Sequence, residues 1–181
     1  MRAVPLGLEI LTVLSVIGAG VLFVARSPSR KTREWPQEMH VVTPAGVVDR
    51  IRTGDGPVLV VIFAGWCDEC RREIPALDRA LADFVDTDLQ VVAVAVDEDA
   101  DSYTPFATPH VALRPMRLAP GEQDGLVRAL WSLGASYHRS IPYVALFDRH
   151  GALVRDRWPE AHRVDQIRLT LSSLSTNAAL R

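Results

Sequence analysis

The two cysteines of the chain, Cys67 and Cys70, lie three residues apart and follow a continuous apolar run, Val58–Ala64. This run is rich in β-branched residues and predicts a strand buried on both faces. Because the chain has no other cysteine, the fold must be held together by burial and not by a disulfide framework. A Cys/His zinc site is also disfavoured, since the nearest histidines, His40 and His110, are remote in sequence. We therefore expect the two cysteines to work as a pair.

The composition and charge of the chain indicate a folded protein without a nucleic-acid partner. Of 181 residues, 48% are hydrophobic and 23% are charged, so a packed core is expected. This length suits one domain plus an appendage. The formal net charge of −2 offers no basic excess to neutralise a phosphate backbone.

The N-terminal 25 residues are nearly all apolar and predict a membrane segment. Residues 3–25 contain one charge, Glu9, and exceed the length of about 20 residues that spans a bilayer. We expect residues 1–25 to form an uncleaved transmembrane anchor, with a cleaved signal segment or a buried helix as the alternatives. Residues 26–38 are predicted to be a polar linker and residues 39–181 the folded domain.

The charges that flank this segment bear on its orientation. Arg2 precedes the segment, and four basic residues follow it: Arg26, Arg30, Lys31 and Arg33. Taken alone, the positive-inside rule would keep the domain in the cytoplasm.

Apolar patterns within the domain predict an alternation of strands and helices. The predicted strands are Met39–Thr43, Val47–Ile51, Val58–Ala64, Gln90–Val96, Arg114–Leu118, Tyr143–Phe147 and Ala152–Arg155. The predicted helices are Cys70–Phe84, Ala100–Pro109, Glu122–Leu133 and Ala161–Leu174. The first helix joins two buried strands, which predicts a right-handed βαβ unit with a parallel core.

The position of the cysteine pair at the start of a helix favours redox chemistry. Cys67 lies at the predicted helix N-terminus, where unpaired backbone N–H groups and the helix dipole stabilise a thiolate. The thiolate is the form that attacks a disulfide sulfur. Cys70 lies one turn further along, on the apolar face, where it can displace a substrate from a mixed disulfide. Half of a zinc site and a pair of inert core thiols are the alternatives.

The segment Phe63–Pro75, with the sequence FAGWCDECRREIP, resembles the active-site region of thioredoxins. Within that superfamily it is most similar to the membrane-anchored TlpA/ResA-like thiol–disulfide oxidoreductases. The resemblance implies an α/β, thioredoxin-like fold: a central mixed sheet flanked by helices, with an insertion before a hairpin that a cis-proline opens. It also implies that Pro75 kinks the active-site helix, that Ile141-Pro142 is the cis-proline loop, and that Glu73 is a buried glutamate.

Each implied site residue has a physical role and an alternative. A cis bond before Pro142 would present backbone beside Cys67, so that a client chain could pair there as a strand; the alternative is a trans proline opening an edge strand. Glu73 could take the proton of the resolving thiol, and the alternative is a solvated acid near the start of the helix. Trp66 is expected to shield the rim of the site and to contact the client.

Two departures from the thioredoxin pattern concern acidic residues. The buried aspartate of thioredoxins would align with Val61, which leaves Glu73 as the only candidate acid. Asp68 and Glu69 stand between the cysteines, where most relatives carry a proline. Two carboxylates there oppose the thiolate, although the arginines that follow partly offset them, so a reducing couple is expected.

The resemblance implies an extracytoplasmic dithiol reductase that keeps cysteine pairs of client proteins reduced, in cytochrome c or metalloprotein maturation. It implies a membrane thiol as electron donor and a single-pass location in the cell (inner) membrane, with the domain in the periplasm. We adopt this orientation against the charge rule, because an anchored reductase is most useful where thiols face oxidation. The Cys67–Cys70 disulfide is the redox centre, so we expect no cofactor and no metal.

Two other functions remain open. An oxidase or isomerase would use the same pair, but Asp68 and Glu69 disfavour it. A copper or haem chaperone would hold its cargo through both thiolates. Such a site normally recruits an additional His or Met, and neither lies near the motif.

Overall fold

A computed structural model describes residues 39–98, 112–159 and 163–178 of the chain. The predicted anchor, the predicted linker and the predicted helix Ala100–Pro109 lie outside the described residues. Within the described ranges, no helix is both long enough and apolar enough to cross a membrane.

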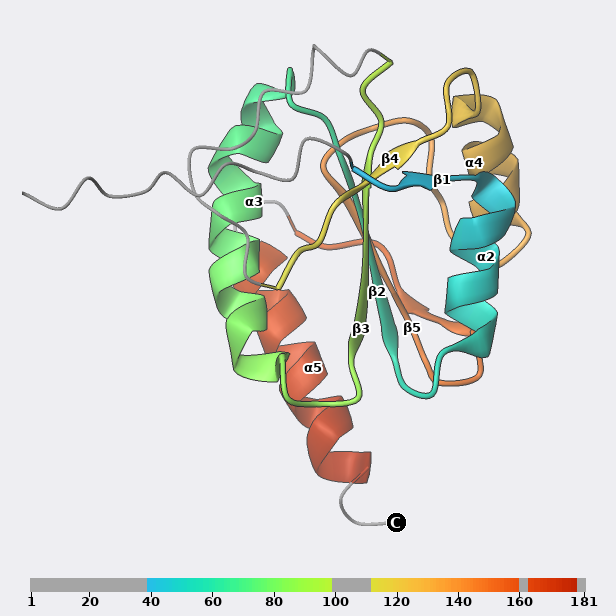
Figure 1. The fold of residues 1–181 in the computed structure, drawn as a ribbon. Helices are drawn as coiled ribbons and strands as arrows, with labels where there is room; N and C mark the ends of the chain where they lie inside the picture. The colour runs from blue at the N-terminus through green and yellow to red at the C-terminus, as the bar shows by residue number, and fades with distance from the viewer. Residues whose placement is uncertain (1–38, 99–111, 160–162, 179–181) are drawn as a thin grey trace, which may run out of the picture. The chain divides into compact units, whose positions relative to one another are not determined.

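The described residues form one mixed sheet of six strands in the order β1-β4-β3-β2-β5-β6 (Figure 1). The strands are β1 (Val41–Val42), β2 (Val58–Phe63), β3 (Gln90–Ala95), β4 (Met116–Leu118), β5 (Tyr143–Phe147) and β6 (Leu153–Arg155). The first four in this order are mutually parallel, whereas β5 and β6 run antiparallel to their neighbours. The mixed sheet and the β5–β6 hairpin agree with the predicted fold class.

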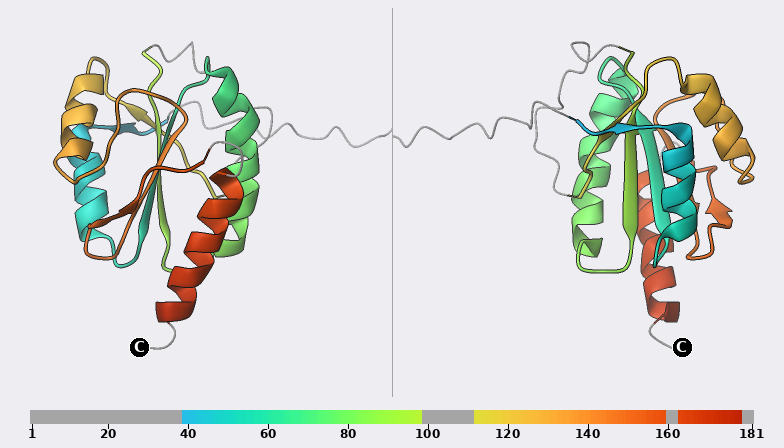
Figure 2. Two further views of the ribbon diagram at one scale, coloured as in Figure 1. Left: turned by 180° about the vertical axis from the view of Figure 1, so that it is seen from behind. Right: turned by 45° about the vertical axis from the view of Figure 1, so that its right-hand side comes forward.

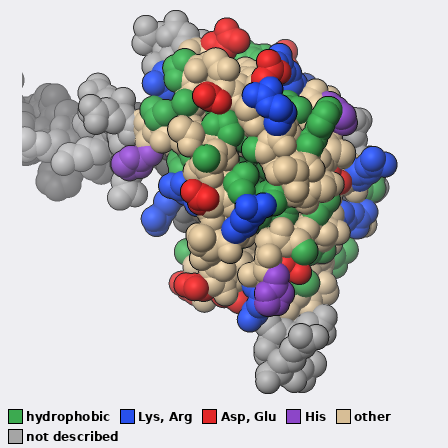
Figure 3. Space-filling view, turned by 90° about the vertical axis from the view of Figure 1, so that its right-hand side faces the viewer, with side chains coloured by type: hydrophobic (Ala, Val, Ile, Leu, Met, Phe, Trp, Pro, Cys, Tyr) green, Lys and Arg blue, Asp and Glu red, His purple; other side chains and the backbone are tan. Residues whose placement is uncertain are grey.

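Two pairs of helices cover the sheet. The helices are α2 (Pro44–Thr53), α3 (Asp68–Leu81), α4 (Gln123–Trp131) and α5 (Arg163–Ala178), with a 3-10 turn, η2 (Ala82–Phe84), after α3. Helices α2 and α4 contact each other on one face of the sheet, and α3 and α5 contact each other on the opposite face (Figures 1 and 2). On the surface that Figure 3 shows, acidic and basic side chains are interspersed.

Strand β2 is the centre of the core and leads directly to the cysteine pair. All six of its residues are buried, as the apolar run predicts. It pairs in parallel with β3 from Val58 opposite Gln90 to Phe63 opposite Ala95, and on its other side it pairs antiparallel with β5. The position of the carboxyl end of β2, where the chain leaves the sheet, is therefore fixed by a neighbouring strand on each side.

The prediction of a strand at Val47–Ile51 is wrong, because this segment belongs to helix α2. Thr43 caps the helix, its hydroxyl accepting a hydrogen bond from the Gly46 N–H at 3.1 Å. Pro44 occupies the first turn, where its missing N–H costs nothing. The two end residues of the segment lie one helical turn apart and are both buried. Tertiary burial of that stripe therefore outweighs the β propensity of its valines.

A single carboxylate fixes both ends of the loop that carries Pro142. Asp156, which follows β6, accepts hydrogen bonds from the Ser136 N–H at 2.5 Å and the Ser136 hydroxyl at 2.7 Å. The same oxygen accepts the Tyr143 hydroxyl at 2.9 Å. Burial acts to raise the pKa of Asp156, but the hydrogen bonds from Ser136 and Tyr143 outweigh it and hold the pKa below its ordinary value.

We expect Asp156→Ala to lower the free energy of unfolding near neutral pH by about 1–3 kcal/mol, because three donors lose their acceptor. The lowered pKa means that the ionised carboxylate stabilises the fold above the pKa of the unfolded chain, about 3.9, and that this contribution is lost as the pH falls through the folded value. The difference between wild type and variant should therefore shrink toward about pH 3. Urea unfolding at both pH values measures it.

Asp86→Ala is the matched control, because this carboxylate is exposed in the turn after η2. It should leave the unfolding free energy nearly unchanged. Equal stability of Asp156→Ala and wild type near neutral pH would show that the carboxylate does not fix the loop.

Candidate active site

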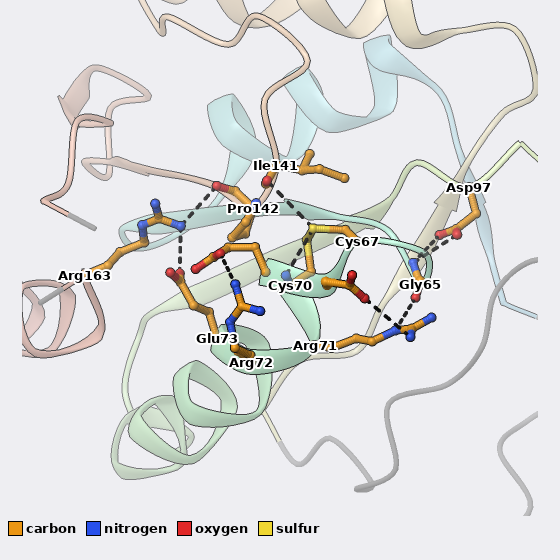
Figure 4. Close-up of a disulfide and its surroundings, with 12 residues drawn as sticks. Gly65, Cys67, Cys70, Arg71, Arg72, Glu73, Asp97, Ile141, Pro142 and Arg163 are labelled. Atoms are coloured by element: carbon orange, nitrogen blue, oxygen red, sulfur yellow. Dashed lines mark hydrogen bonds and ion pairs between the residues drawn. A yellow bond between two sulfur atoms is a disulfide. The ribbon is translucent and has the colours of Figure 1, made fainter. Parts of the chain in front are cut away.

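The structure joins Cys67 and Cys70 in a disulfide at the point where β2 gives way to α3 (Figure 4). Cys67 is the N-cap residue of α3, and its sulfur accepts a hydrogen bond from the Cys70 N–H at 3.1 Å. Cys67 is 7% exposed to solvent, whereas Cys70 is completely buried. A client sulfur can therefore approach only Cys67, and the backbone donor that stabilises a thiolate there is already in place.

The predicted proline loop faces the sulfur of Cys67, the less buried cysteine of the pair. The Ile141–Pro142 peptide bond is cis, so the alternative of a trans proline is wrong. The Ile141 carbonyl oxygen lies 3.8 Å from the Cys67 sulfur. A disulfide sulfur has no proton to donate, so in this oxidised form the approach is a contact and not a hydrogen bond. Figure 4 shows the loop reaching over the disulfide.

Trp66 lies next to the pair and is 59% exposed. An indole that is this open contributes little to the core, because most of its apolar area stays in water. Its position at the rim agrees with the expected contact to a client, and that role stays a prediction. Pro75 lies inside α3, where the resemblance places it.

The turn that leads into the cysteine pair is held from both sides at Gly65. Its N–H donates to both carboxylate oxygens of Asp97, at 3.0 and 3.1 Å. Its carbonyl oxygen accepts a hydrogen bond from Arg71 Nε at 2.9 Å. The backbone before Cys67 is therefore fixed by two side chains: Asp97, which follows β3, and Arg71, which belongs to α3.

Asp97 corrects the expectation that Glu73 is the only candidate acid. It is 3% exposed, and burial raises its pKa even though the hydrogen bond from Gly65 acts in the opposite direction. A buried acid is thus present near the pair, although Val61 replaces the aspartate that thioredoxins carry in the central strand. The sequence offered one signal: Asp97 closely follows the strand paired in parallel with β2, so their carboxyl ends share one edge.

Glu73 lies on α3 and is not the solvated acid of the alternative interpretation. Its side chain is 17% exposed, and one of its oxygens is 2.7 Å from Nη1 of Arg163, at the start of α5. Burial is the main influence on the Glu73 pKa and raises it; Arg163 acts to lower it, and the neighbouring Glu69 adds to the rise. The role of Glu73 as proton acceptor stays a prediction.

The two acidic residues between the cysteines each form an ion pair one turn further along α3. Asp68 lies 3.7 Å from Arg71, and Glu69 contacts Arg72. These pairs are largely exposed, so water and salt weaken their fields. The pKa of Glu69 is lowered, first by a hydrogen bond with Glu73 and then by Arg72. The two ion pairs and their exposure to water therefore reduce the repulsion that these acids exert on a Cys67 thiolate.

Metal ligands do not gather at this site or elsewhere in the described part of the chain. Among residues 39–98, 112–159 and 163–178, no three His, Cys, Asp or Glu side chains are placed to hold one ion.

Comparison with known proteins places this geometry in a family. The AhpC/TSA family model matches residues 48–156. A thioredoxin of Pseudomonas aeruginosa is 36% identical over 61 residues, which cover 34% of this chain and 56% of that protein. The chain thus spans just over half the length of this curated relative.

Solved structures show the same fold at low sequence identity. The thioredoxin domain of a thiol–disulfide oxidoreductase from Bacteroides vulgatus superposes with a TM-score of 0.52 at 16% identity, covering 65% of this chain and 80% of that one. A thioredoxin-family thiol:disulfide interchange protein from Chlorobium tepidum gives 0.50 at 22% identity, with the same coverage of 65% and 80%. The predicted thioredoxin-like fold is therefore confirmed.

Proposed function

The chain belongs to the AhpC/TSA family, and we propose that it is a thiol–disulfide oxidoreductase that exchanges its Cys67–Cys70 pair with disulfides of client proteins. One observation carries the proposal: the sulfur of Cys67 caps α3 and faces the cis-proline loop, and Cys67 retains some exposure whereas Cys70 is fully buried. An inert structural disulfide would need neither the backbone donor nor the open rim at Trp66.

The exchange proceeds in two balanced steps. The Cys67 thiolate attacks one sulfur of the client disulfide, forming a mixed disulfide and releasing the other client sulfur as a thiolate. The Cys70 thiol then loses its proton and attacks the Cys67 sulfur. This step forms the Cys67–Cys70 disulfide and releases the second client sulfur. Two electrons pass from the enzyme dithiol to the client.

The loop around Pro142 supplies a place for the client backbone. Because proline has no N–H, it makes no backbone hydrogen bond as a donor there, and an incoming client strand can pair with the loop backbone beside Cys67. The exposed ring of Trp66 offers apolar area on the adjacent rim. Client recognition in this arrangement depends on backbone pairing and on contact with the indole.

We further propose that the enzyme acts as a reductase. Asp68 and Glu69 oppose negative charge on Cys67, which destabilises the reduced form and makes the couple more reducing. Their ion pairs with Arg71 and Arg72 reduce this effect without removing it, because the pairs are exposed and screened.

The order of attack is tested by trapping. We expect Cys70→Ser to accumulate mixed disulfides with client proteins, because the attacking thiol remains and the resolving thiol is missing. Cys67→Ser should accumulate none, since Cys70 is inaccessible. Non-reducing gels of both variants and of the double variant as control give the readout. Trapping by Cys67→Ser alone would reverse the assignment.

The direction of electron flow is tested by the reduction potential. We expect a value at or below that of thioredoxin, about −270 mV, from equilibration with dithiothreitol or glutathione. Changing Asp68→Asn together with Glu69→Gln should make the potential less negative, because the thiolate is then opposed by less charge. Asp83→Asn together with Asp86→Asn serves as a control of equal charge change away from the site, because both carboxylates are exposed beyond the far end of α3. A wild-type potential near about −120 mV would instead indicate an oxidase.

We propose that residues 3–25 anchor the protein in the cell membrane with the domain in the periplasm. The length and apolarity of the segment and the resemblance to anchored oxidoreductases support this proposal. A membrane thiol protein would then supply electrons, and the clients would be proteins with cysteine pairs, in cytochrome c or metalloprotein maturation. Such clients meet oxidising conditions outside the cytoplasm.

Topology is tested by fusing reporters after Arg181. We expect a reporter that is active only outside the cytoplasm to give signal, and a cytoplasm-only reporter to give none. The basic residues after the segment favour the reverse orientation. The two reporters therefore distinguish a periplasmic domain from a cytoplasmic one. Signal from the cytoplasmic reporter alone would contradict the periplasmic location and the clients that follow from it.

A further inference from the structure

Arg163 joins three segments of the site. One nitrogen, Nη1, lies 2.7 Å from a carboxylate oxygen of Glu73 on α3 and 3.3 Å from the carbonyl oxygen of Pro142. The guanidinium therefore bridges the helix of the cysteine pair and the cis-proline loop from the start of α5. Figure 4 shows the Glu73 carboxylate pointing toward this arginine.

The position of Arg163 is unfavourable for a positive charge, so it must be compensated by contacts with acceptors. It is the first residue of α5, where the positive end of the helix dipole disfavours a cation. Its side chain is 13% exposed, and an arginine this enclosed needs acceptors in place of water. Glu73 and the Pro142 carbonyl are those acceptors. The ion pair with Glu73 thus compensates for both burial and dipole.

We propose that Arg163 is a positioning residue of the exchange reaction: it fixes the Glu73 carboxyl group one helical turn after Cys70 and ties it to the loop on which the client docks. The inference rests on the proposed function. It adds a residue outside the cysteine motif, ninety positions from Glu73 in sequence.

The chemistry explains why an ionised Glu73 is needed. Cys70 is buried and must lose its proton before its sulfur attacks the mixed disulfide. The Glu73 carboxylate receives that proton, and the resulting Cys70 thiolate attacks the Cys67 sulfur. The Cys67–Cys70 bond forms as the bond between Cys67 and the client sulfur breaks, and the client sulfur leaves as a thiolate. Burial raises the pKa of Glu73 and so favours its protonated form, which cannot accept a proton; the charge of Arg163 opposes this effect.

The other described charges that face Glu73 come from its own helix. Glu69 lies one turn before it and raises its pKa, first by a hydrogen bond and then by its negative charge, and Arg72 is paired with Glu69. From the remaining elements the described partners are Arg163 and the Pro142 carbonyl. Arg163 is therefore the described cation that acts directly on Glu73, and it is the residue to change.

The test measures the titration of Glu73 by carbon NMR of labelled glutamate side chains in the oxidised full-length protein, with Glu73→Gln identifying the signal. We expect Arg163→Gln to raise the Glu73 pKa and Arg163→Lys to bring it back toward wild type. Arg168→Gln should change nothing, because that arginine lies on the same helix and is exposed. An identical Glu73 titration in wild type and Arg163→Gln overturns the proposal.

Disulfide exchange with a client peptide supplies a second readout. In Arg163→Gln we expect the pH profile to move to higher pH and the rate near neutral pH to fall about tenfold, part of the 10²–10⁴ that a general base contributes. A merely structural tie would lower stability and leave the profile in place. If the wild type exchanges disulfides and Arg163→Gln has the same pH profile, this inference alone is refuted. If the wild type does not exchange disulfides, the proposed function is refuted.

A third measurement needs no folded Arg163→Gln protein. In wild type, the Arg163 guanidinium NMR signals should shift with the Glu73 titration, because the two groups share a hydrogen bond. Guanidinium signals that stay constant through the Glu73 transition contradict the proposal.

Discussion

The two hydrogen bonds from the Gly65 N–H to Asp97 fix where β2 ends and α3 begins. They hold the backbone two residues before Cys67, the N-cap of α3. The turn is stabilised from the other side by Arg71, so both peptide groups of Gly65 are satisfied in a place that water hardly reaches. The reactive sulfur, its backbone donor and its distance from the proline loop all depend on this one turn.

Three carboxylates of α3 face three arginines, and their burial differs. Asp68 and Glu69 pair with arginines of their own helix at the surface. Glu73 instead pairs across to α5 in a largely enclosed position. The surface pairs are screened by water and salt, so they contribute weakly to the electrostatic potential at the site. The enclosed pair interacts more strongly, because the medium around it has a lower dielectric constant. In the proposed mechanism, the same residue types thus act on the Cys67 thiolate at the surface and on the proton of Cys70 in the enclosed position.

Much of the fold and the cysteine pair could be predicted, because both rest on local patterns. Continuous burial gives β2 its apolar run, helical spacing gives α3, and the cysteines mark the start of that helix. Helix α2 was missed, since its capping threonine and paired apolar positions compete with a valine-rich composition that also suits a strand. Asp97 and Arg163 reach the site from distant parts of the chain, and a single sequence shows no periodicity that would link them to Gly65 or Glu73.

The strand order leaves the sheet with very short margins. Insertion of β4 between β1 and β3 moves the two-residue β1 to one border, and the three-residue β6 forms the other. Long, flat borders are templates on which another chain can add a strand and start aggregation. An enzyme that recognises extended client segments must accept a strand at one chosen place only. In the described part of the chain the long strands β2, β3 and β5 are all interior. The border strands therefore offer a client segment few places to pair other than the backbone beside Cys67.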